Sequence, residues 1–186
     1  MSRFFPPSEY VQAMVSVFEL TLTPIQFQDY CAAVEMIQRA GEKPVDINLL
    51  HETLCASEAT AGLFREGPAV ALRDLKLVER PYPRATAIHQ LLFSFRQAYK
   101  RALRGEIPEE FLDIHTLAWQ VAATGRCIHP FLVGNTRLFT LIENHIRQSH
   151  GLPWRIDFCE KDKFRNFRRL YMIRHAEFYG EIAGAP

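Results

Sequence analysis

Apolar residues recur every three to four positions through most of this chain, and this spacing constrains its fold more than any other feature. Such a pattern marks the buried face of an amphipathic helix. We expect helices over residues 23–41, 84–105, 108–126, 135–150 and 161–179, and a further short helix after Asp46. Thr23 and Asp46 suit N-caps, and Pro24 and Pro108 suit first helical positions. The sequence therefore predicts a mainly α architecture.

One segment departs from helical spacing. Residues 69–78 partly alternate between apolar and polar side chains, and two proline-containing segments, at 67–68 and 81–83, bracket them. Alternation between such turn signals is typical of a short β-hairpin. An exposed hairpin edge would offer unpaired backbone groups to an extended partner segment. The alternative is a hairpin that only covers the helical core.

The charge balance and the cysteine spacing exclude several functional classes. Lys plus Arg number 22 and Asp plus Glu number 21 among 186 residues, so no net basic field favours nucleic acid as a partner. The basic run at 161–175 is interpreted as the solvated face of a helix. No apolar run approaches the roughly 20 residues that span a bilayer. Four widely spaced cysteines indicate reduced thiols and an intracellular protein, either cytoplasmic or delivered into a host cell as an effector.

A candidate anion site lies where the helix over 135–150 is expected to begin. The first N–H groups of a helix lack intrahelical partners, and the helix dipole adds positive potential there, so this end suits a phosphate. Gly134 and Asn135 occupy the turn, and Gly134 lets the backbone approach a ligand closely. Arg137 adds a positively charged guanidinium group, whose N–H donors can bind phosphate oxygens. These residues predict a phosphate-binding turn.

His129 precedes this turn in the chain. A histidine can accept a proton near neutral pH, so His129 is a candidate general base. Pro130 stiffens the loop, and Phe131 can anchor it in the core. From these residues alone, the alternative is an ordinary helix start that carries a structural histidine. The other histidines and the cysteines lack zinc-site spacing, so no metal site is expected.

The stretch "HPFLVGNTR" resembles the Fic-family signature H-P-F-x-(D/E)-G-N-G-R-x-x-R. The matching positions are His129, Pro130, Phe131, Gly134, Asn135 and Arg137. The resemblance covers about residues 51–154, because "GLFR" upstream and "GLPW" downstream also resemble family segments. It implies a Fic-type helical domain over residues 42–186, with the motif at 129–140 and a small β-hairpin flap at about 63–83. Residues 1–41 would form an N-terminal helical extension.

The resemblance also implies a function. In the family, the histidine takes a proton from a hydroxyl of a target protein, and this hydroxyl attacks a nucleotide phosphate, most often with transfer of AMP from ATP. His129 would be the general base, and Gly134, Asn135 and Thr136 would form the phosphate turn. Arg137 would hold the outer phosphates. ATP or another nucleotide is therefore the expected donor.

In the family, the flap binds the target as an added strand, and main-chain hydrogen bonds hold this strand in place. In this chain Leu75, Lys76 and Leu77 are the expected contact residues. The sequence does not identify the target protein, and a homo-oligomer stays an open alternative.

Three functional positions depart from the family pattern. Val133 replaces the acidic residue that holds Mg²⁺, so magnesium is doubtful as a cofactor. Thr136 replaces the second glycine, and Thr140 replaces the final arginine. We therefore expect an altered site of weak activity. Two alternatives stay open: a transferase that uses a phosphate or phosphocholine donor, and an inactive Fic-fold module that binds a protein partner.

Three further polar residues have simple structural interpretations. Arg65, beside the flap, is expected to bridge core segments rather than to contact substrate. His115 is expected to be a structural histidine. Asp113 is a minor alternative as a distant metal ligand.

Overall fold

The chain folds into a mainly helical domain. The computed structural model describes residues 5–17, 20–73, 76–79, 82–109, 113–156 and 161–179. In chain order its elements are α1 (Pro7–Val17), α2 (Pro24–Ala40), α3 (Ile47–Leu54), β1 (Val70–Arg73), β2 (Lys76–Glu79), α4 (Ile88–Leu103), α5 (Ile114–Ile128), α6 (Asn135–Ser149) and α7 (Lys161–Arg174), with 3-10 turns at Ala85–Ala87 and Ala176–Phe178. The predicted mainly α architecture is confirmed. Within these ranges, no helix combines the length and the apolar character that a membrane span requires.

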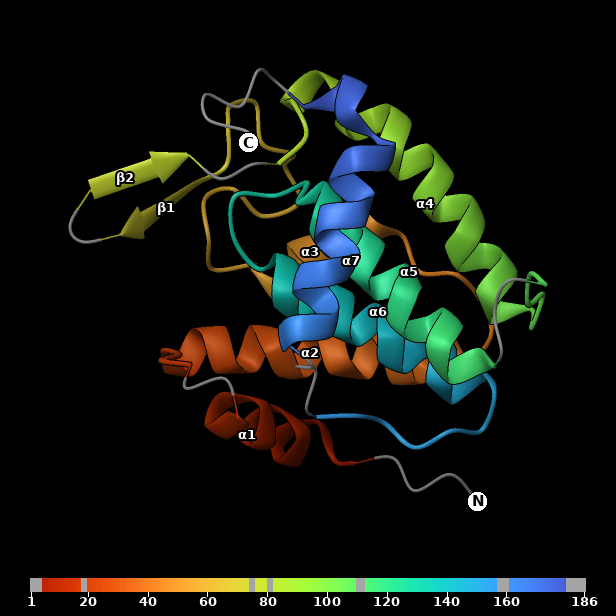
Figure 1. Ribbon diagram of the computed structural model, residues 1–186. Helices are drawn as coiled ribbons and strands as arrows, with labels where there is room; N and C mark the ends of the chain where they lie inside the picture. Colours follow the sequence, from red (N-terminus) through yellow and green to blue (C-terminus); the bar gives the residue numbers. More distant parts are fainter. Residues whose placement is uncertain are drawn as a thin grey trace.

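Helix α6 forms the centre of the molecule, and the other helices surround it (Figure 1). Helices α2, α3, α4 and α5 contact α6, whereas α7 packs on α5 and α1 packs on α2. Every residue from Leu138 to Arg147 is buried, so the polar side chains among them need partners. Asn144 donates to the Tyr10 hydroxyl of α1 (2.9 Å), and His145 Nε2 lies 2.8 Å from the Gly41 carbonyl oxygen. These contacts join the N-terminal segment to the central helix.

Local capping signals set the starts of two helices. The Thr23 hydroxyl accepts a hydrogen bond from the Gln26 N–H (3.2 Å), and the Gln26 side chain accepts one from the Thr23 N–H (2.9 Å). Asp46 accepts from the N–H groups of Asn48 and Leu49 at the start of α3. Both predicted N-caps are therefore confirmed.

The predicted start of α5 at Pro108 is wrong. Pro108 lies in a loop, and the helix begins at Ile114. Asp113 is the N-cap, because its carboxylate accepts from the Thr116 N–H (2.7 Å), and this hydrogen bond lowers the pKa of the Asp113 carboxyl. The Asp113 carboxylate thus has a capping role. At the other end of the chain, α7 ends at Arg174, earlier than the predicted 179.

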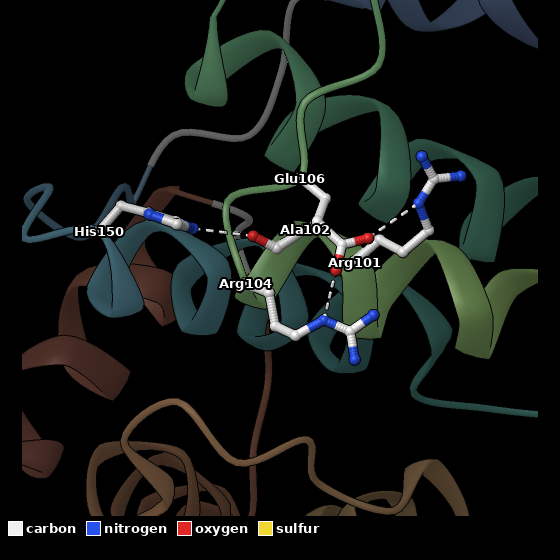
Figure 2. Close-up of polar contacts among 5 residues, drawn as sticks. All are labelled: Arg101, Ala102, Arg104, Glu106 and His150. Carbon is white, nitrogen blue, oxygen red and sulfur yellow. Dashed lines mark hydrogen bonds and ion pairs between the residues drawn. The ribbon is translucent and has the colours of Figure 1, made fainter.

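A polar cluster orders the chain after α4 (Figure 2). His150 Nε2 lies 2.8 Å from the Ala102 carbonyl oxygen, so the end of α6 is joined to the last turn of α4. Glu106 pairs with Arg104 (2.6 Å) and Arg101 (3.2 Å), and these contacts lower the pKa of its carboxyl group. The three charged side chains are exposed, so their contribution to stability is small.

The hairpin projects from the helical body (Figure 1). Strands β1 and β2 are antiparallel, with Val70 opposite Glu79 and Arg73 opposite Lys76. Among the described residues this sheet has two strands, so within that part of the chain each strand has one edge without a sheet partner. Lys76 and Leu77 lie in β2, whereas Leu75 is outside the described residues.

Helices α5 and α6 approach closely at Gly125, which gives a first testable prediction. A Cβ atom at this position would lie 2.2 Å from two ring atoms of Phe139, a fully buried side chain. We expect Gly125→Ala to lower the free energy of unfolding by about 1–3 kcal/mol, because overpacking outweighs the better helix propensity of alanine. Denaturant unfolding measures this change.

Gly67→Ala is the matched control, because a Cβ atom at Gly67 would have no atom within 4 Å. We expect this variant to change stability by less than about 0.5 kcal/mol. Equal stability of the two variants would contradict the close approach of α5 and α6 at Gly125.

Candidate functional site

The loop between α5 and α6 places His129 in an unusual backbone conformation. His129 has φ 50° and ψ 59°, and it is the non-glycine residue with positive φ among the described residues. Its N–H caps α5 by donating to the Gly125 carbonyl (3.1 Å). A left-handed residue ends the helix and turns the chain toward α6, which is why the predicted helix end at 126 is two residues short.

Asn135 closes this loop with its side chain. Its Oδ1 accepts from the Phe131 N–H (3.1 Å), and its Nδ2 donates to the Phe131 carbonyl (2.7 Å). Both residues are buried, so this reciprocal pair holds the loop against the core. The Asn135 side chain is therefore engaged within the loop, and its backbone N–H is the group that can face a ligand.

A cavity of about 220 Å³ lies at the start of α6. Its lining residues are Met14, Leu20, His129, Leu132, Val133, Gly134, Asn135, Thr136 and Arg137. The residues expected as base, phosphate turn and phosphate clamp thus border one space. Met14 and Leu20 add an apolar wall from the N-terminal segment, which sequence reasoning did not connect with the site. Leu132 and Thr136, which belong to this lining, are both exposed.

Gly134 needs to be glycine for two independent reasons. It is the N-cap of α6 and has a left-handed backbone, with φ 76°. A Cβ atom here would also lie 2.8 Å from the Sγ of Cys55, the C-cap residue of α3. The turn is therefore packed tightly on α3 while its other side borders the cavity.

Arg137 is held at the cavity by the ring of Tyr30. Its guanidinium carbon lies 5.9 Å from the centroid of this fully buried ring of α2. Such a cation–π contact fixes a positive charge without neutralising it. Arg137 therefore adds positive potential beside the first turn of α6, whose dipole has the same sign.

The guanidinium of Arg126, from α5, contacts position 140, where the Fic pattern has its second arginine, and sequence reasoning missed this contact. Its Nη2 donates to the Thr140 hydroxyl (2.6 Å), and both residues are buried. The Thr140 hydroxyl in turn donates to the Thr136 carbonyl (2.8 Å). A positive charge is thus retained under the first turns of α6, although it comes from another helix. The signal in the sequence was only a lone basic residue in an apolar run, three positions before His129.

The residues around the cavity do not fit a magnesium ion. Magnesium prefers hard oxygen ligands, usually one or two carboxylates. Of the described residues that line the cavity, none carries a carboxylate, and Val133 (40 % exposed) has the place of the acidic residue in the Fic pattern. We therefore assign no chemical step to magnesium.

The ring of His129 stacks on an aromatic ring from a distant part of the chain. It lies parallel to the Tyr82 ring, with centroids 4.1 Å apart and planes at 18°. The guanidinium carbon of Arg168, from α7, lies 4.5 Å from the centroid of the same Tyr82 ring. The stack fixes the plane of the imidazole, so His129 is oriented before any substrate arrives.

Arg65 joins the base of the hairpin to the His129 loop. Its guanidinium donates to the carbonyl groups of His129 (2.7 Å), Gly67 (2.8 Å) and Pro83. Its backbone N–H donates to the Pro130 carbonyl (2.9 Å). Arg65 is buried, and its contacts fit the bridging role predicted from the sequence. His115, also expected to be structural, lies 3.0 Å from Arg147 through its Nδ1.

Two solved structures that match this arrangement of helices are described as Fic proteins. A Fic domain-containing signaling protein from Bacteroides thetaiotaomicron matches with a TM-score of 0.58 and 17 % identity, over 91 % of this chain and 69 % of that protein. A Fic family protein from Desulfovibrio desulfuricans matches with a TM-score of 0.60 and 16 % identity, over 92 % of this chain. The fold is that of a Fic domain.

The match is one of fold alone. This chain spans 57 % of the length of the Desulfovibrio protein. Neither a protein-family model nor a curated protein sequence matches it. The activity of this Fic-fold chain therefore has to be argued from its own residues.

The left-handed conformation of His129 gives a second testable prediction. We compare His129→Gly with His129→Ala, since both variants lose the imidazole and its stack on Tyr82. A left-handed alanine costs about 1–2 kcal/mol, which the greater chain entropy of unfolded glycine offsets in part. We expect the glycine variant to be more stable than the alanine variant by about 1 kcal/mol, or about 2–4 °C in melting temperature. Calorimetry measures this difference, and an equal or lower melting temperature for the glycine variant would contradict the assigned φ.

Proposed function

We propose that this chain transfers a nucleotide-derived phosphate group, with AMP as the first candidate, to a hydroxyl of a target protein. The observation that supports this proposal is that His129 and the first turn of α6 border the same cavity. A proton acceptor and an anion-binding helix end are the two parts that such a transfer requires. The activity is weak, because the Fic pattern is changed at three positions.

The proposed reaction is an in-line displacement at phosphorus. The target hydroxyl gives its proton to the His129 imidazole, and its oxygen forms a bond to the phosphorus of the donor. The bond from this phosphorus to the leaving diphosphate breaks, and the electron pair leaves with the diphosphate. The N–H groups of Gly134, Asn135 and Thr136 hold phosphate oxygens, and Arg137 offsets the negative charge.

The hairpin is proposed as the flap that receives the target. Its projecting strands offer backbone groups along an edge, and Arg65 fixes the base of the hairpin to the His129 loop. A target strand added to this edge, beside Lys76 and Leu77, would therefore be held in a defined position relative to the base.

A second candidate function is a binding module without turnover. It is favoured by Val133, which leaves the cavity without a carboxylate, and by Thr140, whose hydroxyl is occupied by Arg126. In this case the hairpin captures a protein partner, and the cavity binds an anion or no ligand. A third candidate keeps the transfer but moves a phosphate or phosphocholine group in place of AMP, and it is favoured by Thr140, which replaces the arginine that would hold an outermost phosphate.

A transfer assay with labelled ATP, GTP, UTP and CDP-choline, each with Mg²⁺ and with EDTA, separates these candidates. We expect label on a protein acceptor with one donor, with little dependence on Mg²⁺, and a loss of about 10²–10⁴-fold in His129→Ala. Transfer that survives this substitution would refute His129 as the base. Absence of transfer from every donor would favour the binding module.

A further inference from the structure

His51 lies under the candidate phosphate turn, and no step of the proposed reaction uses it. It comes from α3 and is fully buried. Its ring lies flat on the ring of Phe131, with centroids 3.7 Å apart and planes at 3°. A Cβ atom at Gly134 would lie 3.3 Å from His51 Nε2, so the imidazole directly supports this turn.

Two hydrogen bonds determine which ring nitrogen of His51 carries the proton. The Gly62 N–H donates to Nδ1 (2.9 Å), so Nδ1 must offer a lone pair. The proton is therefore on Nε2, which donates to the Val133 carbonyl (3.0 Å). Burial lowers the pKa of His51, which agrees with a neutral ring that both accepts and donates.

The Val133 carbonyl and the Gly134 N–H belong to the same peptide unit. In a trans peptide these two groups point in opposite directions, and the unit is planar. Since the carbonyl points toward His51, the Gly134 N–H points away from α3. Both residues line the cavity, whereas His51 does not. The bond from His51 thus fixes the direction in which the Gly134 N–H faces the cavity.

We propose that His51 is a positioning residue that orients the Gly134 N–H toward a bound phosphate. This inference rests on the phosphate-binding turn of the proposed function. If this inference holds, the two hydrogen bonds of His51 have different roles. The bond to the Val133 carbonyl orients the ligand site, whereas the bond from the Gly62 N–H stabilises only the fold.

Two isosteric variants test this separation. In His51→Gln the amide nitrogen reaches the place of Nε2 and can still donate to Val133, whereas the bond from Gly62 is lost. In His51→Asn the amide oxygen takes the place of Nδ1 and can still accept from Gly62, whereas the bond to Val133 is lost. Both variants lose the stack on Phe131, so we expect similar losses in melting temperature.

The readout is the affinity for inorganic phosphate and pyrophosphate by calorimetry, together with the Gly134 amide signal in ¹⁵N NMR spectra without ligand. We expect the Gln variant to bind within about threefold of the unmodified protein and the Asn variant to bind about tenfold more weakly. The Gly134 signal should move in the Asn variant and stay close to its position in the Gln variant.

Equal losses of affinity in both variants, or an unmoved Gly134 signal in the Asn variant, would overturn the positioning role. If the unmodified protein binds neither anion, the phosphate-binding part of the proposed function fails. The Gly134 signal then still decides whether His51 orients this peptide, because that measurement needs no ligand.

Discussion

Replacement of Arg65 by methionine is expected to lower the free energy of unfolding by about 3 kcal/mol or more. Arg65 is 3 % exposed, and its guanidinium donates to three backbone carbonyl groups. Methionine fills a similar volume but donates nothing, so these carbonyl groups lose their shared partner. Each buried polar group without a partner costs about 1–3 kcal/mol. Denaturant unfolding followed by circular dichroism measures the loss.

Arg39→Met is the control for this prediction. Arg39 pairs with Glu35 on the surface of α2 and its side chain is 80 % exposed, so we expect a change below about 0.5 kcal/mol. Arg65→Lys should recover only part of the loss, because an ammonium group cannot reach three separated carbonyl groups as a planar guanidinium does. An Arg65→Met protein as stable as the Arg39→Met protein would contradict the bridging role of Arg65.

The second large effect is expected at Thr140. Restoring the arginine of the Fic pattern by Thr140→Arg places a second guanidinium beside that of Arg126, at a position that is 2 % exposed. Two like charges in a buried site repel, and an unpaired buried charge costs about 3–5 kcal/mol. We expect Thr140→Arg to lose about this much stability, or to fail to fold. Thermal melting and soluble yield measure the effect.

Removing Arg126 should reverse this loss. We expect the double variant Arg126→Met with Thr140→Arg to fold and to recover most of the stability, because one positive charge then remains in the site. Thr136→Arg, at an exposed position one turn earlier on α6, serves as the control and should change stability by less than about 0.5 kcal/mol. A stable Thr140→Arg single variant, or no recovery in the double variant, would refute the contact between Arg126 and Thr140.

This coupling also decides how catalysis could be restored. Val133→Asp together with Thr140→Arg would restore two of the three changed positions of the Fic pattern. Because Arg126 already holds the Thr140 hydroxyl, a third change at Arg126 has to accompany them. Residues 126 and 140 are therefore coupled through this contact, and neither can be exchanged alone without cost.

Much of the fold could be predicted from local signals. The spacing of apolar residues located the helices, and Thr23 and Asp46 marked helix starts because a capping bond depends on residues close in sequence. The start of α5 was misplaced, since Pro108 and the capping carboxylate of Asp113 are competing signals a few residues apart. Only the packed chain shows that Asp113 makes the bond.

The candidate site could be predicted only in part. The motif brought His129, Gly134 and Arg137 together, because they are neighbours in sequence. The supports beneath them, Arg126 and His51, come from other helices and could not be predicted. Their contacts depend on which side chains meet across α3, α5 and α6, and no local pattern contains that information.

The central claim is that the first turn of α6 binds a phosphate group. It is tested most directly by titration with pyrophosphate in EDTA, followed by a crystal structure of the complex. We predict saturable binding, with the anion within hydrogen-bond distance of the N–H groups of Gly134, Asn135 and Thr136. Binding should be lost in Gly134→Ala, because a Cβ atom there meets Cys55 and strains a residue with φ 76°. No saturable binding at millimolar pyrophosphate, or an anion bound away from this turn, would contradict the account.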